Sequence, residues 1–267
     1  MSFIHVWRCF NGVIKREFLR FLNQKGRFFG ALVRPLVWLF IFAAGFRSIL
    51  GVSIIPPYET YILYEEYITP GLLGMILLFN GMQSSLSMVY DRELGSMRIL
   101  LTTPLPRWIL LCCRLFASVV IALFQCAVFL IIAYLWNIQP PAIGYLSVLP
   151  AIFIGGIMLG ALGLLLSSFI KQLENFAGIM NFVIFPMYFA SSALYPLWKI
   201  EDVSPWLFKL CSWNPFTYVV ELIRFSLYGQ FSAKALIIVT VCAMIFMFLA
   251  FMGYDPKRNG NTKMERA

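Results

Sequence analysis

The chain has 267 residues, of which 61% are hydrophobic, 17% aromatic and only 12% charged, and its formal net charge is +9. Soluble domains carry about 25% charged residues, so this chain has too few charges to cover a water-exposed surface. The composition excludes a soluble enzyme and a disordered chain, and it predicts a membrane protein. A spanning helix takes about 20 residues, so the length leaves no room for a large domain outside the membrane.

The first 28 residues follow an amphipathic pattern. Large apolar side chains recur every three or four residues, and cations fall on the opposite side of the same predicted helix. We expect residues 1–28 to form an interfacial helix whose cations face anionic lipid headgroups. The alternative is a basic helix that packs on a soluble partner. The apolar positions are Phe3, Trp7, Phe10, Ile14, Phe18 and Phe21, and the cationic positions are Arg8, Lys15, Arg16 and Arg20.

Six apolar segments follow, each long enough to cross a bilayer. We therefore predict an all-α membrane protein with a single transmembrane domain over residues 1–267. Before the last segment, residues 196–234 are too charged to span and too apolar for a solvated loop, so we expect short helices that dip into the outer leaflet. The predicted crossings are residues 31–50, 68–90, 108–136, 145–170, 176–195 and 235–254.

Six crossings place both termini on the same side of the membrane. That side collects all but five of the 21 lysines and arginines, so we expect it to be cytoplasmic. The positive charge is thereby explained by topology, and nucleic acid is not expected as a partner. Arg114 lies inside the third crossing near its start, where its side chain is expected to extend toward the interface. The five exceptions are Arg47, Lys199, Lys209, Arg224 and Lys234.

Polar side chains form a stripe along the second crossing. Their spacing places them on one helix face, and Asp91 lies one turn further on. An amide that faces acyl chains is costly, so the stripe faces protein or a water-accessible path. Two interpretations stay open: hydrogen bonds between helices, or a substrate pathway. The stripe comprises Asn80, Gln83, Ser84 and Ser87, and a weaker counterpart on the fifth crossing comprises Asn181, Tyr188 and Ser192.

Small residues and one proline mark the packing of the fourth and fifth crossings. Gly156, Gly160 and Gly163 are spaced to leave bare backbone on one face, which favours close approach of a neighbouring helix. Pro186 lies within the fifth crossing, where it removes a backbone hydrogen bond and favours a kink.

Motifs of several enzyme classes are missing from the sequence. There is no G-x-x-x-x-G-K-[ST] segment, so the chain does not hold nucleotide phosphates itself. There is no H-E-x-x-H or G-x-S-x-G, and the single histidine, His5, lies outside the crossings. The acidic residues lie at or beyond helix ends, unlike those of a proton-driven pump. We expect no catalytic residue, metal or cofactor in this chain, and an energy source on another protein.

Two segments resemble a known family. Residues 91–107 contain an acid, a glycine two residues later, a leucine pair and then Thr-Pro. Residues 214–218 read Asn-Pro-Phe-Thr-Tyr and are followed by an acid and an arginine. Both are similar to signature segments of ABC-2 type exporter permeases, and with the amphipathic start and the six crossings the resemblance covers essentially the whole chain. The second segment contributes the signature residues Asn214, Pro215, Glu221 and Arg224.

The resemblance implies the permease subunit of an ATP-driven exporter in a bacterial inner membrane. Such a subunit would move a hydrophobic, lipid-like or glycan substrate out of the cytoplasm or inner leaflet. It would pair with a second permease copy or a paralogue and bind two ATPase chains, which hold ATP and magnesium. The alternative is a non-transporting membrane scaffold or a channel subunit. The segment over 91–107 would be the coupling helix on the ATPase, with the residues Asp91, Arg92, Glu93, Gly95, Arg98, Leu100, Leu101, Thr103 and Pro104.

Overall fold

The computed structural model describes residues 3–23, 25–43, 45, 57–58, 63–93, 107–170 and 172–254. Within these ranges the chain is helical and has no strand, which confirms the predicted all-α class. In a bilayer every backbone N–H and C=O must be satisfied within the protein, and long apolar helices achieve this without a partner strand.

Four of the helices are long and apolar enough to cross a membrane: α4 (Tyr64–Glu93), α6 (Arg107–Leu135), α7 (Gly144–Phe169) and α12 (Ala233–Gly253). They coincide with the second, third, fourth and sixth predicted crossings. The first predicted crossing corresponds to α2 (Lys25–Val37) and the short π-helix η1 (Trp38–Ala43). The fifth corresponds to α8 (Leu173–Phe189), whose 17 residues reach about 26 Å. The count of six crossings therefore stays a prediction.

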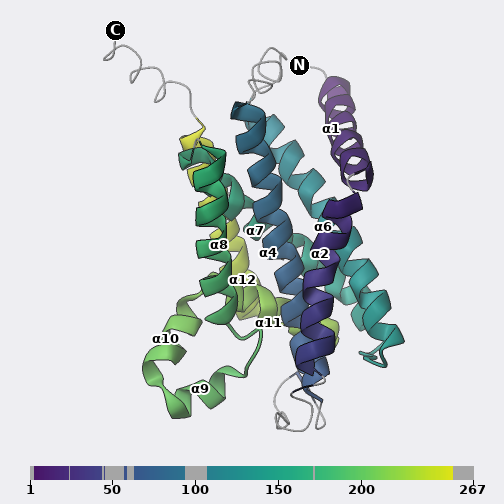
Figure 1. Cartoon of the computed structure of the whole chain (residues 1–267), viewed down its shortest axis with the longest axis vertical. Coiled ribbons are helices and arrows are strands. Elements are labelled where there is room, and N and C mark those ends of the chain that lie inside the picture. Colours follow the sequence, from purple (N-terminus) through teal and green to yellow (C-terminus); the bar gives the residue numbers. More distant parts are fainter. Residues whose placement is uncertain are drawn as a thin grey trace.

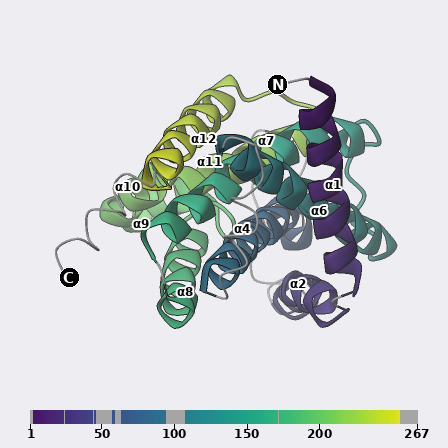
Figure 2. The ribbon, with the colours of Figure 1, turned by 90° about the horizontal axis from the view of Figure 1, so that it is seen from above.

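The long helices run side by side along the long axis of the molecule (Figure 1). Seen from above, α4 and α7 lie toward the middle, with α1, α2 and α6 on one side and α8 and α12 on the other (Figure 2). The end of α4, the start of α6 and the end of α12 lie at the same end of the bundle (Figure 1). The core is built around α4, where Leu72, Leu73, Leu77 and Leu78 are fully buried.

Bare backbone allows α4 and α7 to make the most extensive helix contact in the structure. A Cβ atom at Gly81 would lie 2.9 Å from the carbonyl oxygen of Leu159, and one at Gly163 would lie 2.8 Å from the carbonyl oxygen of Gly81. Real Cβ atoms do not approach backbone this closely. The close approach predicted from the glycines of the fourth crossing is thereby confirmed at Gly163, and its partner is α4.

The N-terminal helix α1 (Phe3–Asn23) packs along α6. Phe10 meets Phe116 with ring centroids 5.7 Å apart, and Phe18 meets Phe124 at 6.0 Å. Both members of the second pair lie eight residues after those of the first, so the two helices run in the same direction. Part of the apolar face of α1 is thus covered by protein, and its interfacial position in a membrane stays a prediction.

Three short helices connect α8 to α12: α9 (Leu197–Val203), α10 (Pro205–Trp213) and α11 (Pro215–Leu227). They lie at the end of the bundle opposite to the end of α4 (Figure 1). The backbone of α11 approaches α7 closely, because a Cβ atom at Gly144 would overlap the carbonyl oxygen of Leu227. The depth of residues 196–234 in the outer leaflet stays a prediction.

Candidate functional site

The polar stripe of α4 begins at Asn80, which is buried against α6. Its Nδ2 donates to the carbonyl oxygen of Ser118 at 2.7 Å and to the Ser118 hydroxyl at 3.1 Å. An amide in this position satisfies its hydrogen-bonding groups on the neighbouring helix. Asn80 therefore forms hydrogen bonds between helices, which is the first of the two interpretations of the stripe.

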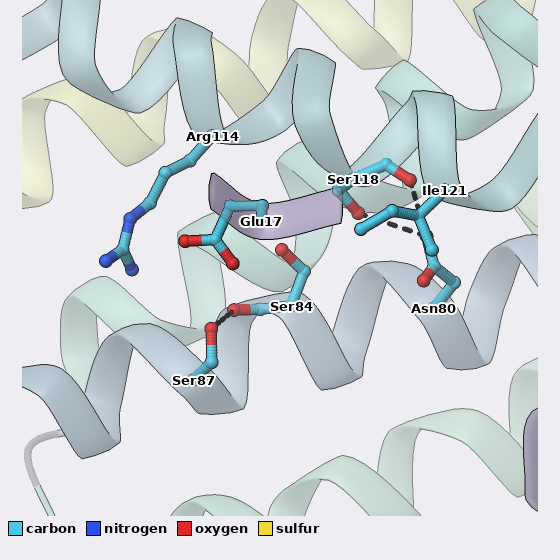
Figure 3. Close-up of a pocket in the computed structure, with 7 residues that line it drawn as sticks. All are labelled: Glu17, Asn80, Ser84, Ser87, Arg114, Ser118 and Ile121. Carbon is cyan, nitrogen blue, oxygen red and sulfur yellow. Dashed lines mark hydrogen bonds between the residues drawn. The ribbon is translucent and has the colours of Figure 1, made fainter. Parts of the chain in front are cut away.

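A small polar pocket lies beside Asn80, where α1, α4 and α6 meet (Figure 3). Its volume of about 10 Å³ is close to the space that one water molecule needs. In Figure 3 the carboxylate of Glu17 faces the pocket between the side chains of Arg114 and Ser84. The pocket is lined by Glu17, Asn80, Ser84, Ser87, Arg114, Ser118 and Ile121.

Arg114 forms an ion pair with Asp91 that joins α6 to α4. The two side chains are only 11% and 14% exposed, so the pair is largely withdrawn from solvent. The partner, Asp91, lies in the last turn of α4, at the same end of the bundle as the start of α6. The expectation that Arg114 extends toward the interface stays a prediction, and the ion pair adds a protein partner to it. The sequence contained a signal for this pair: an arginine two turns inside an apolar helix requires a partner.

The remaining residues of the α4 stripe have mixed surroundings. Ser84 and Ser87 are half-buried, and the Ser87 hydroxyl donates to the carbonyl oxygen of Ser84 at 2.7 Å. Gln83 is also half-buried but does not line the pocket, and no hydrogen bond from it is seen within the described part of the chain. The stripe thus contains Asn80, whose amide is hydrogen-bonded to α6, and Gln83, whose amide has no hydrogen bond to the described residues.

The predicted polar face of the fifth crossing does not form one continuous surface. Asn181 is exposed on α8, whereas Tyr188 is buried and packs against the ring of Trp38, with centroids 5.9 Å apart. The prediction that this crossing continues to residue 195 is wrong, because α8 ends at Phe189. Ser192 is buried beyond the helix, and its carbonyl oxygen is an acceptor for two other elements.

Asn214 of the second signature segment explains where α8 ends. Its Oδ1 accepts from the backbone N–H of Phe216 at 3.0 Å and caps α11. Its Nδ2 donates to the carbonyl oxygen of Met187 in the last turn of α8, at 2.7 Å, and to that of Ala190 directly after the helix, at 2.6 Å. One amide therefore satisfies the start of α11 and the end of α8, and Pro215 begins α11 in the position where proline is favoured.

Arg224 of the same segment lies buried on α11. Its guanidinium donates to the carbonyl oxygen of Ser192 at 2.7 Å and lies over the ring of Tyr67, 4.3 Å from the centroid. The Tyr67 hydroxyl donates to the same carbonyl oxygen at 3.1 Å. Burial raises the pKa of the Glu221 carboxyl one turn earlier, and the cations of Arg224 and Lys234 oppose that shift. These contacts fix the turn after α8 between α4 and α11.

Most of the predicted coupling segment lies outside the described residues. This holds for Gly95, Arg98, Leu100, Leu101, Thr103 and Pro104. Asp91 and Glu93 belong to the last turn of α4, as does Arg92, and Glu93 is exposed there. In the ranges that the structure describes, no three His, Cys, Asp or Glu side chains are grouped as metal ligands would be.

These features define a multi-pass helical membrane protein whose conspicuous polar groups join helices to one another. A profile of the ABC-2 type transporter family matches residues 8–228. The chain therefore belongs to the ABC-2 type transporter family and is a transport permease, a class of subunit that is not itself an enzyme.

Individual relatives agree with this assignment. Over 218 residues the chain is 27% identical to the putative transport permease ycf38 of Cyanophora paradoxa, covering 80% of this chain and 72% of that protein. The ycf38 protein of Porphyra purpurea is 25% identical over 219 residues, with the same coverage. The probable multidrug ABC transporter permease YbhR of Escherichia coli (strain K12) is 29% identical over 170 residues, covering 62% of this chain and 45% of that protein.

Proposed function

We propose that this chain is the permease subunit of an ATP-driven exporter that moves a hydrophobic, lipid-like or glycan substrate out of the cytoplasm or the inner leaflet. The observation that carries the proposal is the family match over residues 8–228, which includes both α4 with its polar stripe and the signature residues of α11. Similarity to a relative named as a probable multidrug permease favours a hydrophobic substrate.

The substrate path in this proposal runs along the polar side chains of α4 that are not committed to α6. Gln83 and Ser84 are half-buried and provide polar groups within an apolar helix. A second permease copy would complete the path. The aromatic side chains exposed on one face of α8 are a surface suited to that copy, namely Phe182, Phe185 and Phe189.

The energy in this proposal comes from a separate ABC ATPase that holds ATP and magnesium and binds residues 91–107. The whole chain is one transmembrane domain in a bacterial inner membrane, with both termini in the cytoplasm. Residues 1–28 lie at the inner leaflet and residues 196–234 at the outer leaflet. Glu93 is exposed at the end of α4, which supports its proposed role as the acid that meets a cationic surface on the ATPase.

Copurification tests this proposal. The tagged full-length chain, extracted from its own membrane in mild detergent, should retain a bound ATPase. Glu93→Arg should reduce the bound ATPase at least about tenfold, because losing one partner of a charge pair costs about 2 kcal/mol or more. The matched control is Glu201→Arg, which changes an exposed acid of α9 at the opposite end of the bundle and should retain normal binding.

Absence of any ATPase from the wild-type preparation would favour the scaffold or channel alternative and overturn the proposed function. If the Glu93→Arg variant retains a normal amount of bound ATPase, this end of α4 is not the docking site, but the proposed function itself still stands.

A further inference from the structure

We propose that Arg114 is a positioning residue that fastens α6 to α4 directly beneath the connection between them, so that the two helices move as one unit when that connection is displaced. The inference rests on the proposed function, since it assigns a route by which movement at residues 94–106 reaches the membrane-spanning helices. Arg114 lies outside both signature segments, and its partner Asp91 is the first residue of the segment over 91–107.

The position of the ion pair is the first argument. Asp91 lies two residues before the end of α4, and Arg114 lies seven residues after the start of α6. Residues 94–106 connect these two helix ends. The ion pair therefore joins α4 to α6 within about two helical turns of the residues that connect them.

Burial is the second argument. The Asp91 and Arg114 side chains are 14% and 11% exposed, and in such surroundings a charge pair is screened less than at the surface. Arg114 also lines the polar pocket that contains Glu17 of α1, whose side chain is 13% exposed and whose Oε1 accepts from Arg16 at 2.7 Å. The pocket beside Arg114 is thus lined by side chains of three helices, α1, α4 and α6.

Packing of α1 is the third argument. The aromatic contacts of Phe10 and Phe18 hold α1 along α6 on both sides of Glu17 in sequence. Asn80, one turn from Ser84, holds α4 to α6 through Ser118 deeper in the bundle. The Arg114 pair and the Asn80 contact are therefore two attachments of α4 to α6, and only the Arg114 pair is close to the connection.

Spin-label distance measurements on the full-length chain test this assignment. One label pair at Tyr90 and Trp108, both exposed, reports the separation of α4 and α6 beside the ion pair. A second pair at Leu135 and Trp206, both exposed at the other end of the bundle, reports movement far from it. The test variant is Asp91→Asn with Arg114→Gln, which removes both charges but keeps groups able to form a hydrogen bond.

Arg114→Lys keeps the charge and is the rescue control, and Asp202→Asn on α9 is the control for an exposed acid. Without nucleotide, the distance distribution between Tyr90 and Trp108 should be narrow in the wild type and both controls. It should be at least about twofold broader in the double variant. A distribution as narrow in the double variant as in the wild type overturns the inference, with or without a bound ATPase.

Trapping the copurified ATPase with ADP and vanadate should shift the distance between Leu135 and Trp206 in the wild type and in Arg114→Lys. The shift should be smaller by about half or more in the double variant. An equal shift in the double variant overturns the inference, because the ion pair then transmits nothing. If the distance between Leu135 and Trp206 does not shift in the wild type, the result counts against the proposed function. The width of the Tyr90–Trp108 distribution without nucleotide then decides the role of Arg114.

Discussion

Asn80 and Gln83 lie one turn apart on α4, yet their side-chain amides have different surroundings. Asn80 donates two hydrogen bonds to Ser118 of α6. Gln83 has no such partner among the described residues and is half-buried. The two positions therefore separate the structural interpretation of the stripe from its interpretation as a substrate path.

Asn80→Leu should lower the free energy of unfolding by about 0.6 to 1.7 kcal/mol, which are the average and the largest values measured for hydrogen bonds between membrane helices. Gln83→Leu should leave stability nearly unchanged and should alter which substrates are exported. Thermal unfolding in detergent and a substrate panel on both variants measure the two effects. A loss of stability in Gln83→Leu with an unchanged substrate panel would reject Gln83 as part of the path.

Asn214 combines two tasks that an ordinary helix cap does not combine. Asn and Asp are nearly equivalent as simple N-caps. Here the amide nitrogen also donates to two carbonyl oxygens at the end of α8, and a carboxylate would instead repel them. We expect Asn214→Asp and Asn214→Ala each to lower the free energy of unfolding by about 2 kcal/mol. Asn181→Ala on the exposed face of α8 is the control, and an Asp variant as stable as the wild type would contradict the bridging role.

The residue types of the site were partly predictable from the sequence. An asparagine in an apolar helix indicates a partner in the protein, as observed for Asn80. The identity of the partner was not predictable, because Ser118 lies on another helix and is an ordinary small residue there. Likewise, the sequence indicated that Arg114 needs a polar partner near the helix start, but its pairing with Asp91 depends on how α4 and α6 lie in space.

At the scale of elements, the contact between α4 and α7 depends on residues without side chains. Gly81→Ala would place a Cβ atom 2.9 Å from the Leu159 carbonyl oxygen, so the two helices would have to separate. We expect a loss of about 1 to 3 kcal/mol of stability, as for other overpacked contacts. Gly178→Ala on α8 has no atom within 4 Å of the new Cβ and should be neutral or slightly stabilising. Equal thermal stability of the two variants would show that α4 and α7 can move apart freely.

The four helices that are long and apolar enough to cross a membrane were predictable, because unbroken apolar segments of their length have few other stable forms in lipid. The predicted crossing over 68–90 lies within α4 (Tyr64–Glu93), and that over 145–170 nearly coincides with α7 (Gly144–Phe169). The end of α8 was not predictable, because it depends on Asn214 and Arg224, which lie more than twenty residues later in the chain. The packing of α1 on α6 was also not predictable from the sequence, because an amphipathic pattern does not show whether the apolar face of a helix contacts lipid or protein.

For the whole molecule, the distribution of lysine and arginine predicts the orientation in the membrane. Single cysteines introduced into a cysteine-free chain test it at two exposed acids, Asp202 on α9 and Glu174 at the start of α8. Asp202→Cys should react with an impermeant thiol reagent added outside intact cells, and Glu174→Cys should react only after the cells are opened. The reverse result would invert the proposed topology.

ATP-dependent movement of substrate by the reconstituted complex tests the central claim most directly. The full-length chain with its copurified ATPase would be placed in liposomes that contain a fluorescent phospholipid, or ethidium as a drug-like probe. We expect the chain to stimulate ATP hydrolysis and to move at least one probe when ATP is present, with no movement when the ATPase is inhibited by vanadate. Movement that continues equally without ATP, or an ATPase whose activity is the same with and without the chain, would contradict the account.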